Sequence, residues 1–288
     1  MTASLMTLPS TVVWRDITLA DAPACAALSR AVGWPHRAED CAMAIALGHG
    51  SIATVGDEVA AVGMWWPYGE SHATVGMIIV SPDHQGAGIG GRLVQGLLAQ
   101  AKDRSLMLNA TAAGQPLYER LGFVACGGIS QHHGEVLDVA APELAAGAAL
   151  RAATPADAPE IGRLDQAASG LPRGPLLASL LERGECVILE RAGRAVGFSV
   201  LRRFGRGLVV GPVVAESDGD AQALMAHWLH GRRGQFMRID IHTGSPLAGW
   251  LTQHGLKPAG DVVAMVRGAL PVVHGPLRLH ALANQALG

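Results

Sequence analysis

Charged residues are scarce in this sequence. Lys, Arg, Asp and Glu together make up 16% of the 288 residues, the net charge is −2, and no cluster of basic residues is present. Proteins that bind nucleic acid need a basic patch or stripe, so we expect no nucleic-acid partner. The sequence also lacks a run of about 18 apolar residues, the length that a membrane-spanning helix requires, and we expect no membrane association.

Cysteine is rare as well. Cys25, Cys41, Cys126 and Cys186 show no C-x-x-C spacing and lie in apolar surroundings. This pattern favours buried thiols in a cytosolic protein over a disulfide framework. The first ten residues have neither a basic segment nor a sustained apolar core, so they do not resemble a secretion signal. We therefore expect a cytoplasmic protein.

The histidines do not predict a metal site. His132 and His133 are adjacent, and His227 and His230 are three residues apart, but neither pair has a third ligand at a metal-site spacing. Protein zinc sites use three or four protein ligands. Solvated or core histidines are therefore the better interpretation, and no metal is expected.

Glycine, in contrast, is abundant, and one cluster of glycines is the most informative stretch of the chain. Gln85-Gly86-Ala87-Gly88-Ile89-Gly90 lies between an apolar run, 75–80, and an apolar-periodic run, 93–101. This order predicts a strand, a glycine-rich turn and the start of a helix. Glycines let the main chain approach a phosphate, and the free N–H groups and positive dipole end of the helix point at it. The cluster predicts a site for a phosphorylated ligand.

The loop differs from the two best-known phosphate loops. It lacks the G-x-G-x-x-G pattern of dinucleotide folds and the Gly-Lys-Ser/Thr ending of ATPase loops. Instead it fits Q-x-x-G-x-G, and residues 80–90 resemble the acyl-CoA motif of the GNAT superfamily of N-acyltransferases position by position. A second block agrees with that family: residues 106–111, followed by Leu117-Tyr118-Glu119-Arg120-Leu121-Gly122-Phe123. The resemblance covers residues 13–137.

The resemblance implies acetyl-CoA as the cosubstrate. In the family, main-chain N–H groups of the strand before the loop hold the pantetheine and the acyl carbonyl, and the loop holds the pyrophosphate. The positions implied for coenzyme binding are Ile78, Ile79, Val80, Gln85, Gly86, Ala87, Gly88, Ile89, Gly90, Asn109 and Tyr118. The tyrosine of the second block lies by the thioester sulfur in the family, so Tyr118 is the expected general acid. The implied reaction is direct transfer of an acetyl group to an amine of a small molecule or peptide.

The resemblance does not identify a general base. Many family members carry Glu at the start of the strand before the loop, where this sequence has Thr74, a residue that cannot take the proton. Glu70 and His72 lie just upstream, in a segment typical of a solvated hairpin turn. A water relay or an acceptor amine of low pKa would serve as well.

The family reads its acceptor with the segment between the first two helices. Here residues 32–40 place Trp34 and His36 in a charged loop that contains a proline, which suits an amine-bearing small molecule. Trp66 and His72 are further candidates for acceptor binding. Because Trp65 and Trp66 alternate on a predicted strand, one ring faces the core and the other faces either a cleft or further packing.

The chain repeats itself. The segment 15–22 recurs as 151–158 at an offset of 136, residues 61–64 match 195–198 at 134, and residues 121–123 match 254–256 at 133. Matches in order at a nearly constant offset indicate a duplicated domain. We predict an N-terminal acetyltransferase domain at 12–138, a C-terminal GNAT-like domain at 149–270 and a tail at 271–288.

The second copy is predicted to have lost the chemistry. The offset of 134 places Asp220, Gln222 and Leu224 at the three loop glycines, and the offset of 133 places Leu251 at Tyr118. Pro212 within 208–214 predicts an edge or bulged strand.

The second copy has two possible structural roles. Asp165, Gly170 and Arg173 are candidates to line the acceptor cleft from the other side. Trp65, Trp66, Trp228 and Trp250 are candidates for a dry surface between the copies.

The expected fold is α/β, or α+β: two GNAT-like domains, each a mixed, mostly antiparallel sheet with a central splayed parallel strand pair and flanking helices. The expected molecule is a cytoplasmic monomer or homodimer that acetylates a small-molecule amine. Two alternatives remain at this point: a non-catalytic acyl-CoA-binding regulatory module, which the missing Glu at Thr74 favours, and a scaffold that binds no coenzyme. The three loop glycines argue against the scaffold.

Overall fold

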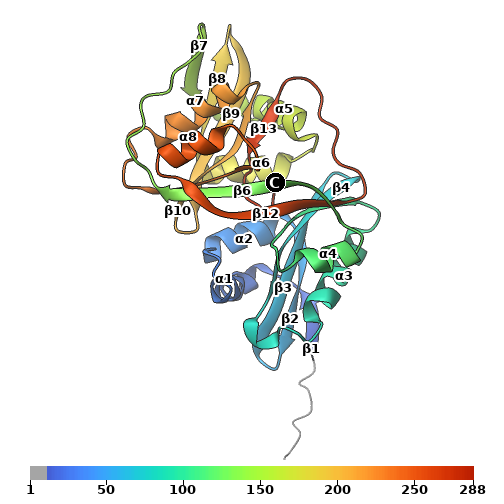
Figure 1. Ribbon diagram of the computed structural model, residues 1–288. Coiled ribbons are helices and arrows are strands. Elements are labelled where there is room, and N and C mark those ends of the chain that lie inside the picture. The colour runs from blue at the N-terminus through green and yellow to red at the C-terminus, as the bar shows by residue number, and fades with distance from the viewer. Residues whose placement is uncertain (1–11) are drawn as a thin grey trace, which may run out of the picture. The chain divides into compact units, whose positions relative to one another are not determined.

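The computed structural model describes residues 12–288 (Figure 1). The first ten residues, to which the expectation of no secretion signal refers, lie outside the described residues. The chain divides into two compact units. The first contains the described residues up to Met64 together with Met77–Gln100, and the second contains Trp65–Gly76 and Ala101–Gly288. The domain limits expected from the sequence remain a prediction.

The first unit carries the glycine-rich loop. Its elements are β1 (Val12–Asp16), α1 (Ala22–Ala31), α2 (Ala38–Leu47), β2 (His49–Val55), most of β3 (Glu58–Tyr68), the end of β4 (His72–Val80) and α3 (Ile89–Ala101). β1 pairs antiparallel with β2. Helix α3 packs close to β3 because Gly63 has no side chain: a Cβ atom there would lie 2.9 Å from Leu97 Cδ1. The buried Leu93 and Leu97 thus fix the helix that follows the loop.

The second unit contains a long sheet with helices. Its further elements are β5 (Ser105–Ala110), α4 (Gln115–Arg120), β6 (Val124–Glu135), β7 (Ala148–Ala152), α5 (Ala158–Ser169), α6 (Gly174–Arg183), β8 (Gly184–Arg191), β9 (Arg194–Phe204), β10 (Gly207–Ala215), α7 (Asp218–Leu229), β11 (Phe236–His242), α8 (Leu247–Gln253), β12 (Lys257–Arg267) and β13 (Arg278–Ala281). Its strand order is β4-β5-β12-β6-β11-β13-β10-β9-β8-β7. β4 with β5 and β10 with β11 are parallel, and the neighbouring pairs between them are antiparallel. The expected mixed fold is confirmed.

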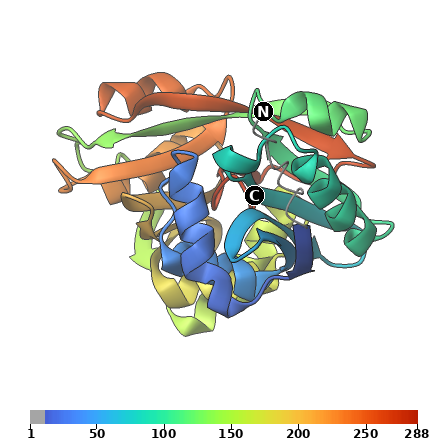
Figure 2. The same ribbon diagram turned by 90° about the horizontal axis from the view of Figure 1, so that it is seen from below.

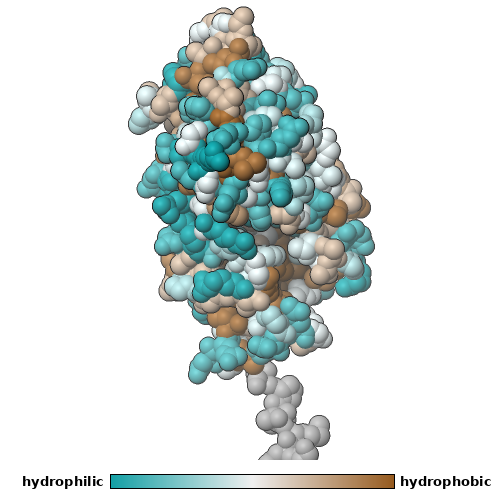
Figure 3. Space-filling view, turned by 60° about the vertical axis from the view of Figure 1, so that its left-hand side comes forward, coloured by the Kyte–Doolittle hydropathy of each residue, from teal (hydrophilic) through white to brown (hydrophobic). Residues whose placement is uncertain are grey.

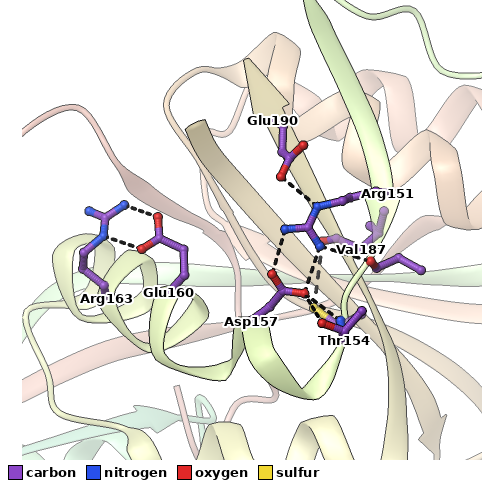
Figure 4. Close-up of polar contacts among 9 residues, drawn as sticks. Arg151, Thr154, Asp157, Glu160, Arg163, Val187 and Glu190 are labelled. Carbon is purple, nitrogen blue, oxygen red and sulfur yellow. Dashed lines mark hydrogen bonds and ion pairs between the residues drawn. The ribbon is translucent and has the colours of Figure 1, made fainter. Parts of the chain in front are cut away.

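Both copies begin with the same charged motif. In the second copy, the guanidinium of Arg151 donates two hydrogen bonds to Asp157, at 2.7 and 2.9 Å, and the N–H of Thr154 donates to the same carboxylate (Figure 4). The first copy makes the same contacts with Arg15, Thr18 and Asp21. In both copies these hydrogen bonds hold the pKa of the carboxyl well below its usual range. The motif caps the turn before each first helix, and the repeat in the sequence is therefore a repeat in structure.

The two copies exchange their last strands. β12, the last long strand of the second copy, pairs with β5 of the first copy, with Val263 opposite Ala110 and Arg267 opposite Leu106. β6, the last strand of the first copy, pairs with β11 of the second copy. β6 and β12 also pair with each other, and they lie side by side in both Figure 1 and Figure 2. Each copy therefore completes its sheet with a strand of the other.

The strand β13 fills the gap between the parallel strands of the second copy. β10 and β11 pair directly only at Leu208–Met237 and Val209–Arg238. Beyond that point β13 lies between them, and Ala281 pairs with both strands. The space that a splayed strand pair offers to a pantetheine is thus occupied by the chain itself.

Pro212 in β10 predicted an edge strand or a bulge, and the structure shows only the bulge. The register shifts between Val210 and Val213, so the predicted bulge at Pro212 is confirmed. The predicted edge position is wrong, because β10 has β9 on one side and β13 on the other.

The loop of the second copy is deleted rather than substituted, which corrects the alignment at constant offset. Only Glu216 and Ser217 separate the end of β10 from the start of α7, so the residues aligned with the loop glycines lie inside the helix. Asp220 accepts a hydrogen bond from Arg191 at 2.5 Å, and Leu224 is in the core.

The equivalence of Leu251 and Tyr118 rests on matching geometry. The main-chain carbonyl of Leu251 accepts from Leu256 N–H at 3.0 Å, and that of Tyr118 accepts from Phe123 N–H at 3.0 Å. The two residues therefore hold the same place in α4 and α8, and the second copy has a leucine where the first has a phenol.

Two of the four tryptophans expected between the copies belong instead to the core of the second copy. Trp228 is buried in one cluster with strand residues such as Val213 and Ile239, and its Nε1 donates to Ser199 Oγ at 2.7 Å. Trp250 packs against the same cluster. Trp65 and Trp66 are buried at 6% and 1% exposure. The proposed dry surface made of these four rings is therefore wrong.

Surface features of the described residues are simple. No helix within residues 12–288 is both long enough and apolar enough to cross a membrane. On the face shown in Figure 3, hydrophobic groups are small and separated by hydrophilic ones.

The four cysteines are free. Cys25 and Cys41 are buried, as expected, whereas Cys126 is exposed, so the expectation of four buried thiols is wrong at that position. Burial raises the pKa of Cys25 and of Cys41 to about 12.

A buried ion pair gives the first prediction. Arg173 donates two hydrogen bonds to Asp165, at 2.6 and 2.9 Å, and both side chains are at most 1% exposed. Arg173→Met leaves the carboxylate buried without a partner, and we expect a loss of about 3–5 kcal/mol in the free energy of unfolding. The matched control is Arg163→Met, which breaks the exposed Glu160–Arg163 pair of Figure 4 and should cost at most about 1 kcal/mol. Urea denaturation measures both; equal losses would contradict the assignment.

Candidate active site

The glycine-rich loop leaves open space where a phosphate would approach. Gly86 and Gly88 have φ angles of +80° and +76°, which favour glycine, and no atom lies within 4 Å of a Cβ built at either position. The Gln85 side chain donates to the Val80 carbonyl at 3.2 Å and so ties the start of the loop to the end of β4. The loop leads directly into α3, whose first-turn N–H groups have no partner within the helix. This local arrangement fits a phosphate ligand.

The strand before the loop departs from regular geometry at one residue. Met77 has a φ of +51°, a left-handed value that is uncommon for a residue with a side chain. Within the second unit, β4 pairs with β5 only at its first three residues, His72 to Thr74. The predicted splay of this parallel pair is thus present, and Ile78 to Val80 lie on the part of β4 beyond the interruption.

Tyr118 lies on α4 and is 8% exposed. Its ring makes an edge contact with Phe123, with centroids 6.0 Å apart, and lies against Gly114, where a Cβ would come within 3.0 Å of the ring. Burial raises the pKa of Tyr118 to about 12, so the hydroxyl is protonated at physiological pH. The hydroxyl can therefore act as a hydrogen-bond donor.

A cavity of about 590 Å³ lies within the second unit. It collects residues from both copies, since Thr74 and Asn109 come from the first and Arg173 comes from the second. Its lining also includes Met107, Leu108, Cys126, Gly127, Gly128, Ile129, Ala168, Ser169, Leu171, Asp218, His242, Ser245, Pro246, Ala264, Met265, Leu270, Pro271, Val273, Arg278, Leu279, His280, Leu282, Gln285 and Gly288. This volume suits a small organic ligand.

The segment after β13 forms part of the cavity wall. Asn109 Nδ2 donates to the Gln285 carbonyl at 2.8 Å, and the Tyr68 hydroxyl donates to the Leu287 carbonyl at 2.5 Å. A Cβ at Gly76 would lie 3.0 Å from Ala286 Cβ. The predicted coenzyme ligand Asn109 thus has its amide N–H engaged by the chain itself.

Thr74, the residue found in place of the expected Glu, lines this cavity. It is 7% exposed, and its hydroxyl lies near that of Tyr68 but makes no hydrogen bond of good geometry. Just before it, Glu70 lies in the exposed turn between β3 and β4, as expected. His72 begins β4; its Nδ1 lies 2.9 Å from Ser71 Oγ, and its Nε2 is buried without a hydrogen bond. His72 is not one of the described residues that line the cavity.

The other residues predicted to bind the acceptor have local partners. His36 Nδ1 lies 2.7 Å from Ser29 Oγ, and its ring contacts that of Trp34 edge-on at 6.0 Å. Both belong to the turn between α1 and α2. Trp66 is buried to 1% exposure and its ring lies against Gly76. A role in acceptor binding stays a prediction for these three residues.

Sequence reasoning missed most of the cavity. Of the second-copy residues suggested for the cleft, Arg173 lines the cavity, while Asp165 lies behind it as its ion-pair partner. Ile129, Met265 and Leu282 were not found because they come from β6, from β12 and from the position just after β13, which are far apart in the sequence. The one available signal was Gly127-Gly128 inside an otherwise regular strand, which often marks a close approach. Among residues 12–288, no group of three or more His, Cys, Asp or Glu side chains is arranged to hold a metal ion.

A splayed parallel strand pair, a glycine-rich loop and a following helix are typical of acyl-CoA-dependent transferases; the first copy has all three, and the second copy repeats the fold without the loop. Two family models, each described as an acetyltransferase (GNAT) domain, match residues 47–125 and 161–275. The chain belongs to the GNAT superfamily and carries two of its domains in tandem.

Known proteins resemble most or all of this chain. An N-acetyltransferase of Bacillus subtilis, named YitH and described as uncharacterized, is 29% identical over 240 residues, which are 81% of this chain and 82% of that protein. A crystal structure of a Pyrococcus horikoshii protein has a TM-score of 0.77 at 20% identity and covers 100% of this chain and 99% of its own. A tandem GNAT protein from the clavulanic acid biosynthesis pathway has a TM-score of 0.62 at 14% identity, with 92% and 100% covered. The two structures share the fold.

Proposed function

We propose that the protein transfers an acetyl group from acetyl-CoA to the amine of a small molecule, with one coenzyme site in the first copy. The observation that carries this proposal is the contrast between the copies. The first has open space at Gly86 and Gly88 before α3, and the second has no such loop and has β13 between its splayed strands. The first copy therefore offers a site for the phosphates and pantetheine of a coenzyme, and the second copy does not.

The residues of the first copy suit that coenzyme. The loop from Gln85 to Gly90 and the first turn of α3 would hold the pyrophosphate with main-chain N–H groups, since an anion at a helix N-terminus is favoured by both free donors and dipole. The main chain of Ile78 to Val80 would pair with the pantetheine and polarise the acyl carbonyl. Acetyl-CoA supplies the reactive thioester.

The reaction needs an electrophile, a neutral amine and a stabilised leaving group. The amine nitrogen attacks the thioester carbonyl carbon, the C–S bond breaks, and the sulfur keeps the electron pair. With a pKa near 12, Tyr118 is a weaker acid than a thiol, whose usual pKa is about 8.5, so it stabilises the thiolate by donating a hydrogen bond. Water then protonates the thiolate and accepts the surplus proton of the nitrogen, because Thr74 is not a base.

We therefore expect Tyr118→Phe to lower kcat about tenfold or more while the Kd for acetyl-CoA changes little. The hydrogen bond to sulfur strengthens as negative charge builds in the transition state, so its loss affects turnover and not ground-state binding. The phenylalanine keeps the contact with Phe123, so the fold is expected to persist. Steady-state thiol release measures kcat, and calorimetry measures the Kd. An unchanged kcat would mean that solvent, and not Tyr118, stabilises the leaving thiolate.

The second candidate function is a regulatory module that binds acyl-CoA without turnover. Thr74, in place of a carboxylate base, favours it. The two functions differ in one observable: a module that only binds gives a stoichiometric complex and no thiol in the presence of any amine.

A further inference from the structure

The cavity of the second unit has an apolar wall on several sides. β5, β6 and β12 contribute Met107, Ile129 and Met265, and the segments after α5 and after β12 contribute Leu171 and Leu270. Leu270 is 51% exposed, as expected for a residue at a cavity mouth. A ligand whose non-reacting part is apolar gains free energy by leaving water for such a wall.

The cavity lacks a free anionic group at depth. Among the described residues that line it, Asp218 is the only acid, and its side chain is 57% exposed. The buried charge of Arg173 is already neutralised by Asp165. A second ammonium group on a ligand would therefore lose its hydration inside the cavity without gaining a counter-charge.

Two buried polar atoms on the described cavity wall make no hydrogen bond, the Thr74 hydroxyl and His280 Nε2, and the first lies on the strand that leads to the glycine-rich loop. The Thr74 hydroxyl lines the cavity, is buried with its residue at 7% exposure and makes no hydrogen bond of good geometry. Thr74 lies on β4, the strand that continues to Ile78 and Val80. An amine N–H can donate to this oxygen, since buried polar atoms are normally hydrogen-bonded.

We propose that this cavity binds the acceptor, and that the acceptor is a primary amine with an uncharged aliphatic or aromatic body. The amine meets Thr74, and the body lies along the wall formed by β5, β6 and β12. Polyamines, and amino sugars that carry more than one ammonium group, are excluded by the absence of a counter-charge. The inference rests on the proposed transferase function and specifies its substrate class.

The test of charge compares hexylamine with 1,6-diaminohexane, which differ only by a terminal amine. We expect kcat/KM for hexylamine to exceed that for the diamine at least a hundredfold in the full-length protein. From ethylamine to hexylamine, kcat/KM should rise about three- to fourfold per methylene until the body fills the cavity. A diamine that reacts as well as hexylamine, or no gain with chain length, would overturn the proposal.

A substitution at Gly127 tests whether the acceptor binds in this cavity. A Cβ there would meet only Ala264 Cβ, at 4.0 Å, so Gly127→Val adds volume to the cavity without a clash at the Cβ. It should reduce kcat/KM for hexylamine at least tenfold and leave ethylamine nearly unchanged. The control Ala125→Val, at an exposed position two residues away on β6, should leave both unchanged. Equal loss for both amines in the two variants would contradict a site at this cavity.

A binding measurement separates this inference from the transferase proposal. Calorimetry with hexylamine alone should give a Kd for the wild type that weakens at least tenfold in Gly127→Val and not in Ala125→Val. If this holds while no amine releases thiol, the transferase proposal fails and the cavity assignment stands. If amines are acetylated but hexylamine binding is indifferent to Gly127→Val, the cavity assignment fails alone. Acetyl-CoA binding by each variant confirms that it is folded.

Discussion

Acetyl-CoA should bind at least about thirtyfold more weakly to Gly88→Asp than to the unmodified protein, a loss of about 2 kcal/mol or more. No atom lies within 4 Å of a Cβ at Gly88, so the new side chain would project into the open space of the loop. The carboxylate would bring a negative charge to the place where the proposal puts the pyrophosphate. Calorimetry gives the Kd directly, and an unaltered Kd would place the coenzyme elsewhere.

Two controls separate the causes. Gly88→Asn has nearly the same size and tolerates the same left-handed main chain, so the difference between Asn and Asp isolates the charge. Gly96→Asp places the same charge on the exposed side of α3, and should leave the affinity nearly unchanged at physiological salt. The unmodified chain should show one site per molecule, since the second copy has no loop; two sites would contradict the assignment of a single coenzyme site.

Residues 1–138 expressed alone should lose all acceptor turnover and aggregate or dimerise. In the whole chain β5 pairs with β12, and β6 pairs with β12 and β11, so the fragment loses each of these partners. The fragment would expose one unpaired edge of β5 and both edges of β6, which are templates for pairing with another chain. Acetyl-CoA binding should survive in the soluble fraction, because the loop and α3 are local. Size-exclusion chromatography and thiol release measure both properties.

Complementation is the matched control for this truncation. Co-expression of residues 139–288 returns β11 and β12 in trans, and we expect a soluble complex with turnover restored. A monomeric fragment 1–138 with full activity would show that the second copy has no part in catalysis.

Local sequence patterns predicted the features that local physics determines. The loop from Gln85 to Gly90 was found because glycines, a preceding apolar run and a following periodic run lie within one short segment. The repeated Arg, Thr and Asp at 15–21 and 151–157 indicated duplication because a capping motif depends on residues a few positions apart. These predictions needed no knowledge of distant contacts.

Such local patterns could not predict which strands pair when they lie far apart in the sequence. The neighbour of β5 is β12, about 150 residues later, and an alternating apolar strand fits equally well beside several partners. The insertion of β13 next to β10 could not be predicted for the same reason, because the sequence predicts only a tail at 271–288. The cavity around Thr74 and Met265 arises from both events, so the sequence held no signal for it beyond the Gly127-Gly128 pair.

The alignment at constant offset failed at one point for a physical reason. The offset counts residues, whereas the second copy shortened the connection between Ala215 and Asp218 and lengthened others. Asp220 therefore lies in the first turn of the helix, where its main-chain N–H donates to the N-cap residue Ser217, instead of filling a loop. The conclusion that the second copy lacks a phosphate loop stands, although the route to it was wrong.

Simultaneous measurement of thiol release and of acetylated amine, with acetyl-CoA and hexylamine as substrates, is the most direct test of the proposed function. The proposed function predicts one thiol and one N-acetyl amine per turnover, a rate about tenfold or more lower in Tyr118→Phe, and no detectable binding to the second copy. Saturable binding of acetyl-CoA without thiol release across hexylamine, benzylamine, amino acids and amino sugars would contradict it and favour the regulatory module.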